Sequence, residues 1–444
     1  MCVRIVLNNV LINVPGIHLK NWDRMLFLSA AILCGSIVGA IGYTPAALKD
    51  QIKNLPGIPS NYESNMFSGY IPVTEDGSKQ LFYWYVESQR NPDIDPLVLW
   101  TNGGPGCSGL SGFLTEQGPF RPTAGLLLTL NTYSWNRISN MVFIEQPVGV
   151  GFSFAKNLSQ VEFSDRSAAT DNYLFVKGFL ERFPNLKKND FYISSESYGG
   201  HYIPTLAKEL VVRGDVNNFK GLLVGNPLTY MPYRDYGQFS TLANHQLVPK
   251  PLWDRYVELQ CHYKNHSGEC GDIEGEMMTI TKGLDPYALD FPVCLDKALS
   301  SGRDERMVFA RSISAASHYF PESYTKCEEN FTEAFLNNPQ VKQALHVRPD
   351  HSGVWGVCNS VVEARYNKED VNREMMSIYK FLIDGGYNLK ILIYSGDNDS
   401  ICATAGTQQF IWDMGYDVLE KWSSWKTKDG QVAGFRVSFQ GKFF

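Results

Sequence analysis

The 444-residue sequence lacks any dense block of lysine or arginine, and its 46 acidic side chains outnumber its 40 basic ones. Nucleic-acid binding depends on such a basic cluster, so we predict no nucleic-acid partner. The sequence also has no visible internal repeat, no Cys-x-x-Cys pair and no nucleotide or flavin motif, so we predict no metal and no cofactor. What it does have is 44% hydrophobic residues, ample for the buried core of a globular protein.

Only one stretch, residues 25–48, is uncharged and apolar enough to enter a membrane. It follows two basic residues and contains the small residues Val38-Gly39-Ala40, which is the order of a secretory signal peptide with its cleavage site. We predict a leader over residues 1–40, with membrane contact only through this segment. An uncleaved anchor is the alternative, because an apolar run of about 17 to 20 residues is marginal for spanning. Met25 is an alternative start of translation.

The cysteines beyond this leader are odd in number. In an oxidising compartment, a set of seven predicts three disulfides and one free thiol. The glycosylation sequons at Asn157, Asn265 and Asn330 are typical of an exported chain, whereas a glycan at the formal sequon Asn398 would obstruct the acidic turn described below. The predicted location is therefore the secretory pathway. The seven cysteines are Cys107, Cys261, Cys270, Cys294, Cys327, Cys358 and Cys402.

Short β-branched or aromatic runs alternate with helical patterns along most of the chain. Such runs are typical of strands covered on both faces, and their alternation with helices predicts an α/β fold, a mainly parallel sheet with helices on both sides. The predicted strands are residues 81–86, 97–100, 141–144, 191–193, 222–224 and 389–394. The predicted helices are residues 168–183, 202–212 and 373–383.

Residues 231–343 depart from this alternation, since they hold four of the seven cysteines and little strand pattern. We interpret them as an insertion, or cap, stapled by disulfides over one end of the sheet. An irregular half-domain with no gating role is the alternative. The core then comprises residues 41–230 and 344–444.

The sharpest local signal is Phe191-Tyr-Ile-Ser-Ser-Glu-Ser-Tyr-Gly-Gly200. A strand is expected to end at Ile193 and a helix to begin just after Ser197. In this context a tight turn lifts a serine hydroxyl above the carboxyl ends of the strands. The turn needs small neighbours: Gly199 is one, and Ser195 stands where glycine is usual. The motif predicts Ser197 as a nucleophile.

Two further motifs follow predicted strands. Adjacent glycines in Trp100-Thr-Asn-Gly-Gly-Pro-Gly-Cys-Ser-Gly109 allow the backbone to point N–H groups into a cavity, as an oxyanion hole requires. A structural Gly/Pro turn is the alternative. The acidic turn Ile393-Tyr-Ser-Gly-Asp-Asn-Asp-Ser400 stands where a Ser…Asp…His chain order places the orienting carboxylate. Turns of both kinds are common, so neither motif decides the function by itself.

Together these motifs resemble the serine carboxypeptidases, exopeptidases with the α/β-hydrolase fold that act in acid. The resemblance runs from about residue 52 to residue 439. It implies that the chain removes single residues from the C-termini of peptides and proteins through an acyl-enzyme, in a lysosome or vacuole or outside the cell. Its implied partners are these C-termini, with a homodimer left open. Further matching motifs are Asn131-Thr-Tyr-Ser-Trp-Asn136, Ile144-Glu-Gln-Pro-Val-Gly-Val-Gly-Phe-Ser153, Gly200-His-Tyr-Ile-Pro204 and Gly225-Asn-Pro-Leu-Thr229.

The resemblance also assigns roles by position in the motifs. It implies Ser197 as nucleophile and Asp399 as the triad carboxylate, with the backbone N–H groups of Gly104 and Tyr198 in the oxyanion hole. Binding of the substrate carboxylate falls to Asn102, Glu116 and Glu196. Two neighbouring carboxyls cannot both ionise easily, so one stays protonated in acid and donates a hydrogen bond to that carboxylate. The implied disulfides are Cys107–Cys358, Cys261–Cys270 and Cys294–Cys327, which leaves Cys402 free.

One part of this pattern is missing, the triad histidine. Its segment is expected downstream of residues 433–439, and all eight histidines precede Asp399. His201, about one helical turn after Ser197, is expected to pack locally rather than to substitute. We therefore expect a carboxypeptidase sequence truncated before its general base, which leaves Ser197 a weak nucleophile. The alternatives are a catalytically impaired relative that binds or stabilises a partner, and an acyltransferase on the same scaffold.

Overall fold

The computed structural model describes residues 4–7, 10–13, 43–264, 266–294, 327–350 and 353–439. It divides into two units, residues 1–44 and 45–444. In the first, β1 (Arg4–Leu7) pairs antiparallel with β2 (Val10–Asn13). Nearly all of the predicted signal segment and the sequon residue Asn265 lie outside the described residues. Within the described ranges, no helix has both the length and the apolar character that crossing a membrane requires.

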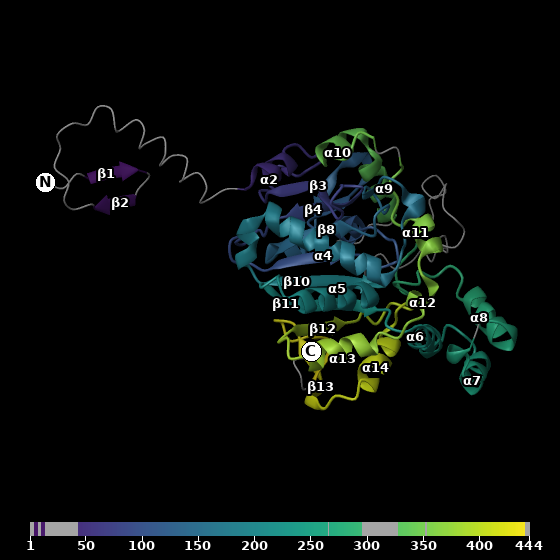
Figure 1. Ribbon diagram of the computed structural model, residues 1–444. Coiled ribbons are helices and arrows are strands. Elements are labelled where there is room, and N and C mark those ends of the chain that lie inside the picture. The colour runs from purple at the N-terminus through teal and green to yellow at the C-terminus, as the bar shows by residue number, and fades with distance from the viewer. Residues whose placement is uncertain are drawn as a thin grey trace, which may run out of the picture. The chain divides into compact units, whose positions relative to one another are not determined.

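An eight-stranded sheet forms the centre of the larger unit (Figure 1). Its order is β12-β11-β10-β5-β8-β4-β3, with β9 paired to β4. Strands β12, β11, β10, β5 and β8 run parallel, whereas β4 is antiparallel to β8, β3 and β9. All six predicted strands are present, and the mainly parallel sheet is confirmed. The strands are β3 (Met66–Pro72), β4 (Lys79–Val86), β5 (Leu97–Thr101), β8 (Asn140–Glu145), β9 (Phe154–Ala155), β10 (Phe191–Ser197), β11 (Phe219–Pro227) and β12 (Lys390–Tyr394).

Helices cover both faces of this sheet, because successive side chains of a strand point to opposite sides. On one face lie α4 (Asp165–Arg182) and α5 (Gly199–Arg213), and Tyr83 of β4 packs edge-to-face on Phe179 of α4. On the other face Trp84 stacks on Phe113, in a core cluster that also takes side chains from α3, α9 and α10. These helices are α3 (Gly109–Ser111), α9 (Glu328–Asn337) and α10 (Pro339–Ala344).

The same second face carries a cavity of about 780 Å³ over β10, β11 and β12. Its lining is mainly apolar and includes Tyr192, Leu223 and Leu392 from the three strands, with Trp135 and Ile138 at its side. Ile138 is 59% exposed and Leu392 is 39% exposed. On this face, side chains of β4 and β8 are therefore buried under helices, whereas Leu392 of β12 is partly exposed to solvent.

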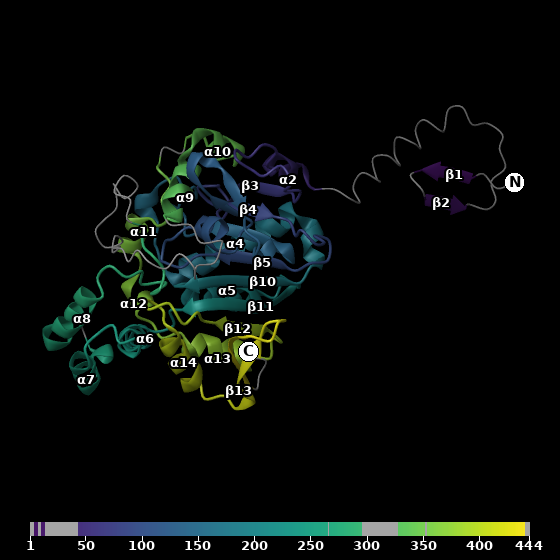
Figure 2. The same cartoon turned by 180° about the vertical axis from the view of Figure 1, so that it is seen from behind.

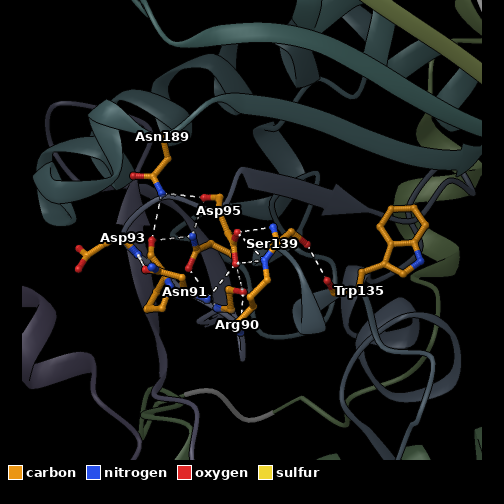
Figure 3. Close-up of polar contacts among 10 residues, drawn as sticks. Arg90, Asn91, Asp93, Asp95, Trp135, Ser139 and Asn189 are labelled. Carbon is orange, nitrogen blue, oxygen red and sulfur yellow. Dashed lines mark hydrogen bonds and ion pairs between the residues drawn. The ribbon is translucent and has the colours of Figure 1, made fainter.

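A polar cluster secures the amino ends of β5, β8 and β10 (Figure 3). Asn140 of β8 and Asn189, just before β10, both donate their side-chain N–H groups to the carbonyl oxygens of Pro92 and Asp95, at 2.7 to 3.0 Å. The buried carboxylate of Asp95 pairs with Arg90, which holds the pKa of that carboxyl below its usual range. Loop carbonyls that burial would leave without partners are satisfied in this way.

The described part of residues 231–343 is mainly helical, and its first three α-helices lie at the periphery of the unit (Figures 1 and 2). The Cys261–Cys270 disulfide joins the segment after α7 to α8. By contrast, α9 and α10 pack into the core of the sheet's second face, and the cap interpretation of the whole segment stays a prediction. The peripheral helices are α6 (Met231–Asn244), α7 (Lys250–Glu258) and α8 (Gly268–Ile280).

Short elements complete the unit, and β13 and β14 form a separate antiparallel hairpin. Most of this hairpin is exposed to solvent. The remaining elements are α2 (Pro45–Asp50), β6 (Phe120–Pro122), β7 (Leu128–Leu130), α11 (Ser360–Arg365), α12 (Lys368–Val371), α13 (Met376–Asp384), α14 (Thr404–Asp413), β13 (Val418–Lys426) and β14 (Val432–Phe439).

Glu145, the last residue of β8, is a fully buried carboxyl that ties three segments together. It accepts hydrogen bonds from the Ser108 hydroxyl (2.5 Å), the Trp355 indole N–H (2.6 Å) and the Phe152 backbone N–H (2.6 Å). Burial raises the pKa of Glu145 to about 7, although these bonds act in the opposite direction. Gly151 leaves room for the carboxyl, since a Cβ there would lie 1.8 Å from its Oε1.

We predict that the cost of Glu145→Gln falls as the pH rises. The folded protein binds this proton more tightly than the unfolded chain, so the stability that Glu145 contributes is full below about pH 4.5 and lost as the pH passes about 7. The loss in the free energy of unfolding should be up to ~3 kcal/mol larger at pH 4.5 than at pH 8. Urea unfolding of both proteins at the two pH values measures this difference.

The exposed Glu75→Gln serves as the control, with a cost near zero at both pH values. An equal cost of Glu145→Gln at pH 4.5 and pH 8 would contradict the prediction.

Candidate active site

Ser197 stands at a strained turn between strand and helix. β10 continues to Ser197, four residues beyond the expected end at Ile193, and α5 begins at Gly199. The φ angle of Ser197 is 54°, in the left-handed region that residues other than glycine rarely adopt. At Gly199 a Cβ would lie 2.1 Å from the Ser195 hydroxyl oxygen. Gly199 therefore makes room for the side chain of Ser195, which stands where glycine is usual.

The glycine loop after β5 lies directly against this turn. A Cβ on Gly103 would lie 2.5 Å from the backbone nitrogen of Tyr198 and 2.7 Å from the carbonyl oxygen of Glu196. Gly104 follows with a φ of 114°, again a left-handed conformation. The two segments that carry the predicted oxyanion donors, Gly104 and Tyr198, are thus in contact. The Cys107–Cys358 disulfide joins this loop to the segment before α11.

Asn102, Glu116 and Glu196 form one hydrogen-bonded cluster. The Asn102 side chain donates to Oε1 of Glu116 at 2.7 Å and to Oε1 of Glu196 at 2.8 Å. Its own Oδ1 accepts from the Trp100 indole N–H and the Gly112 backbone N–H, which fixes the orientation of the amide. Desolvation raises the pKa of Glu196, against the Asn102 hydrogen bond and with the help of the Asp399 charge. The structure therefore brings together all three residues predicted to bind a carboxylate.

Asp399 lies in the turn after β12, so that it and Ser197 both lie at the carboxyl ends of the parallel strands. Its carboxylate accepts hydrogen bonds from the backbone N–H groups of Ile401 (2.6 Å) and Cys402 (3.3 Å). Burial raises the pKa of Asp399 to about 6, although these bonds lower it. The free, buried Cys402 links the two residues, because its Sγ lies 3.9 Å from Oγ of Ser197.

The segment after α8 contacts this acidic turn. Ser400 donates both its backbone N–H and its hydroxyl to the carbonyl oxygen of Pro286, at 2.8 and 2.7 Å. The backbone N–H of Leu289 donates to the carbonyl oxygen of Asn398. Residues 286–289 thus lie beside the turn that follows β12. The cavity over β10 to β12 lies against the face of the sheet instead, so we do not assign it to this site.

The cysteines pair as expected, and His201 packs away from Ser197. All three expected disulfides are present, and Cys402 is free. His201, however, is turned toward Asp165, with Nδ1 3.0 Å from the carboxylate and the ring stacked on Tyr198. Local packing of His201 was the expectation. No hydrogen bond joins any histidine of the described ranges to Ser197 or Asp399.

Several residues around the site have no sequence signal of their own. Trp100 and Gly112 orient the Asn102 amide, and Glu145 supports the loop that begins at Cys107. Their roles depend on contacts between segments far apart in the chain. Trp100 and Glu145 are singled out only by their places in the glycine-rich and Gln-Pro motifs, and Gly112 lies outside both.

A family model of serine carboxypeptidases matches residues 56–444. The chain belongs to the serine carboxypeptidase family. Serine carboxypeptidase-like 33 of Arabidopsis thaliana is 33% identical over 95% of this chain and 91% of its own length. Serine carboxypeptidase-like 26 of the same plant is 36% identical over 88% of this chain and 86% of its own length.

Among solved structures, Kex1Δp, a prohormone-processing carboxypeptidase from Saccharomyces cerevisiae, matches with a TM-score of 0.71. The match covers 90% of this chain and 91% of that one at 21% sequence identity, which establishes a shared fold. The architecture is the α/β-hydrolase fold, and the predicted fold class is confirmed.

We predict that Gly103→Ala strongly destabilises this serine carboxypeptidase-family chain. A methyl group 2.5 Å from the Tyr198 nitrogen must displace backbone on one side or the other. Overpacking of this kind costs roughly 1–3 kcal/mol. Gly275→Ala is the matched control, because nothing lies within 4 Å of a Cβ there and the residue is in α8, where alanine is the better helix former. Thermal unfolding of both variants compares them, and equal melting temperatures would contradict the prediction.

Proposed function

We propose that this chain is a serine-type carboxypeptidase that releases single amino acids from peptide and protein C-termini, through an acyl-enzyme on Ser197 and in acid. The observation that carries the proposal is the Asn102–Glu116–Glu196 cluster, which reaches the nucleophile turn because Glu196 directly precedes Ser197. A cluster that holds a free carboxylate beside a nucleophile selects the last peptide bond of a chain. A site for the free carboxylate of a peptide also argues against the acyltransferase alternative, because transfer to an alcohol does not need one.

The protonation of this cluster supports action in acid. Glu116 and Glu196 accept from the same amide, and Glu196 is already biased toward its neutral form. While one of the two carboxyls holds a proton, it can donate a hydrogen bond to the substrate carboxylate. As the pH rises and both ionise, they repel that carboxylate. Binding of a peptide C-terminus should therefore weaken from acid toward neutral pH.

The proposed steps use the turn and the glycine loop. Ser197 attacks the last peptide carbonyl, and the backbone N–H groups of Gly104 and Tyr198 donate to the oxyanion that forms. The C-terminal amino acid leaves with a proton, the peptide remains as an ester on Ser197, and water then releases it. The attack needs a base held by Asp399. A cationic partner would also lower the pKa of Asp399 from its raised value of about 6 toward the usual value of an aspartate.

A second candidate is a catalytically impaired relative that binds peptide C-termini without cleaving them. One observation favours it, namely that none of the described histidines bonds to Ser197 or Asp399. Without a base, only binding and the oxyanion hole would contribute to the rate, several orders of magnitude below a complete triad.

Release of the C-terminal amino acid from an N-blocked dipeptide at pH 4.5 tests the proposal. We expect release from this chain and none from Ser197→Ala. Free imidazole should raise the rate if the position between Ser197 and Asp399 is open, and leave it unchanged if a histidine of the chain fills it. Binding of the dipeptide with no release, even with imidazole, would establish the second candidate instead.

We predict that Glu196→Gln removes most of the pH dependence of binding. Glutamine keeps the oxygen that accepts from Asn102 but cannot ionise. From pH 4.5 to pH 7.5, the affinity of Ser197→Ala for a peptide should fall roughly tenfold or more. This fall corresponds to about 1.4 kcal/mol of repulsion between the substrate carboxylate and one added negative charge. The same variant with Glu196→Gln should change less than about threefold. Calorimetry measures both, and a peptide with a C-terminal amide is the control that should not bind.

We further propose that the chain is processed in the secretory pathway, for secretion or for a lysosome or vacuole. Three disulfides within the described ranges fit an oxidising compartment. Asn157 is exposed, whereas Asn330 is half-buried in α9 beside the buried Thr332. A glycan at Asn157 is therefore the expected modification. Mass mapping of peptides before and after glycan removal tests it, and an unmodified Asn157 in protein from a eukaryotic secretory host would contradict it.

A further inference from the structure

Behind the Ser197 turn lies a buried polar cluster that the proposed chemistry does not use. We call it the Asp165 cluster, and it consists of Asp165, Tyr198, His201 and Tyr366. Tyr198 and His201 are 0% exposed, Asp165 is 1% exposed and Tyr366 is 3% exposed. Polar groups that are buried this completely are costly unless every one is satisfied, so their arrangement calls for a physical reason.

Asp165 is the centre of this cluster. Its Oδ1 accepts hydrogen bonds from the hydroxyls of Tyr198 and Tyr366, each at 2.9 Å. Its Oδ2 lies 3.0 Å from Nδ1 of His201. The backbone N–H of Asp165 in turn donates to Asp370, at 2.9 Å. The carboxylate of α4 is thus bonded to the N-cap residue and the first turn of α5 and to Tyr366, which follows α11.

The charge of Asp165 is stable in this environment. Burial raises the pKa of the carboxyl, but the hydrogen bonds from His201, Tyr198 and Tyr366 lower it by more than burial raises it. The pKa of Asp165 therefore lies below its usual range. An ionised carboxylate forms stronger hydrogen bonds than a neutral acceptor, especially away from water. Both phenols therefore donate to a charged oxygen rather than to a neutral one.

Tyr198 is held by this cluster on two sides. Its hydroxyl is bonded to Asp165, and its ring stacks on the imidazole of His201 with 4.5 Å between ring centroids and 10° between planes. The backbone of the same residue immediately follows the strained Ser197 and lies against Gly103. A strained turn persists only where its surroundings determine its conformation. The side chain of Tyr198 therefore restrains the peptide plane whose N–H is the predicted oxyanion donor.

We propose that Asp165 is a positioning residue for the oxyanion hole, which acts by holding the phenol of Tyr198. This inference rests on the proposed function of Ser197. It assigns Asp165 no contact with the substrate. It requires that loss of the Tyr198 hydroxyl weakens stabilisation of the tetrahedral state while binding of the peptide stays the same.

Tyr198→Phe and Tyr366→Phe form a matched pair that tests this inference. Each removes one hydroxyl that donates to the same carboxylate oxygen over the same 2.9 Å, and both rings are buried. A merely structural cluster predicts similar loss of thermal stability and similar activity in the two variants. The positioning role predicts a difference in activity, because only Tyr198 contributes its backbone to the turn.

The measurement is release of the C-terminal amino acid from an N-blocked dipeptide at pH 4.5, with free imidazole present. For Tyr198→Phe we expect kcat to fall about tenfold or more with KM unchanged, a part of the 10²–10³ that loss of a whole oxyanion donor costs. For Tyr366→Phe we expect a change of kcat below about threefold. Affinity for a peptide boronic acid, which forms a tetrahedral adduct on Ser197, should fall in parallel with kcat.

The outcomes separate this inference from the proposed function. Equal kcat values for the two variants, or a fall of Tyr198→Phe that appears only in KM, would overturn the role of Asp165 and leave the carboxypeptidase intact. Absence of Ser197-dependent release from the unaltered chain, with or without imidazole, would overturn the proposed function and this inference with it. Asp165→Asn should lower kcat at least as much as Tyr198→Phe, because the neutral amide weakens both phenol bonds.

Discussion

The left-handed backbone of Ser197 is the constraint on which the rest of the site depends. A serine at φ of 54° costs of order 1–3 kcal/mol, and the neighbouring segments must hold it there. They do so by close approach: Gly103 lies against the Tyr198 nitrogen, and Gly199 makes room for the Ser195 hydroxyl. The turn therefore explains why small residues gather at these positions and why β10 extends further than its apolar run.

Buried carboxyls dominate the electrostatics around this turn, and they fall into two groups. Glu145, Glu196 and Asp399 have raised pKa values because burial outweighs the hydrogen bonds that they accept. Asp165 has a lowered pKa because three side-chain donors converge on it. The carboxyls of the first group are biased toward their protonated forms, whereas Asp165 is biased toward its charged form. A change of pH therefore acts on Glu196 and Asp399 beside Ser197 and on Glu145 under the glycine loop, whereas Asp165 behind the turn stays charged.

Much of the fold could be predicted from the sequence, because the buried parallel strands are continuous apolar runs that need no partner to be recognised. The motif residues Asn102, Glu116 and Glu196 could also be placed together through the family resemblance. Glu145 and Tyr366 could not, because their roles arise from contacts across 37 and 201 residues, to Ser108 and Asp165. The sequence also does not predict the antiparallel strand β3 or the cavity over β12. Both depend on which edge and which face of the sheet the rest of the chain leaves uncovered.

The Cys107–Cys358 disulfide has a consequence for the order in which the molecule is made. Its two cysteines are 251 residues apart, so the glycine loop leaves the ribosome long before the segment that secures it. At synthesis rates of 5–20 residues per second, the delay is on the order of 10 to 50 s. During this interval Cys107 has no Cys358 to pair with, and Cys261 and Cys270, which are made before Cys358, are competing partners. The covalent link that secures the glycine loop can therefore form only late in synthesis, after most of the chain has been made.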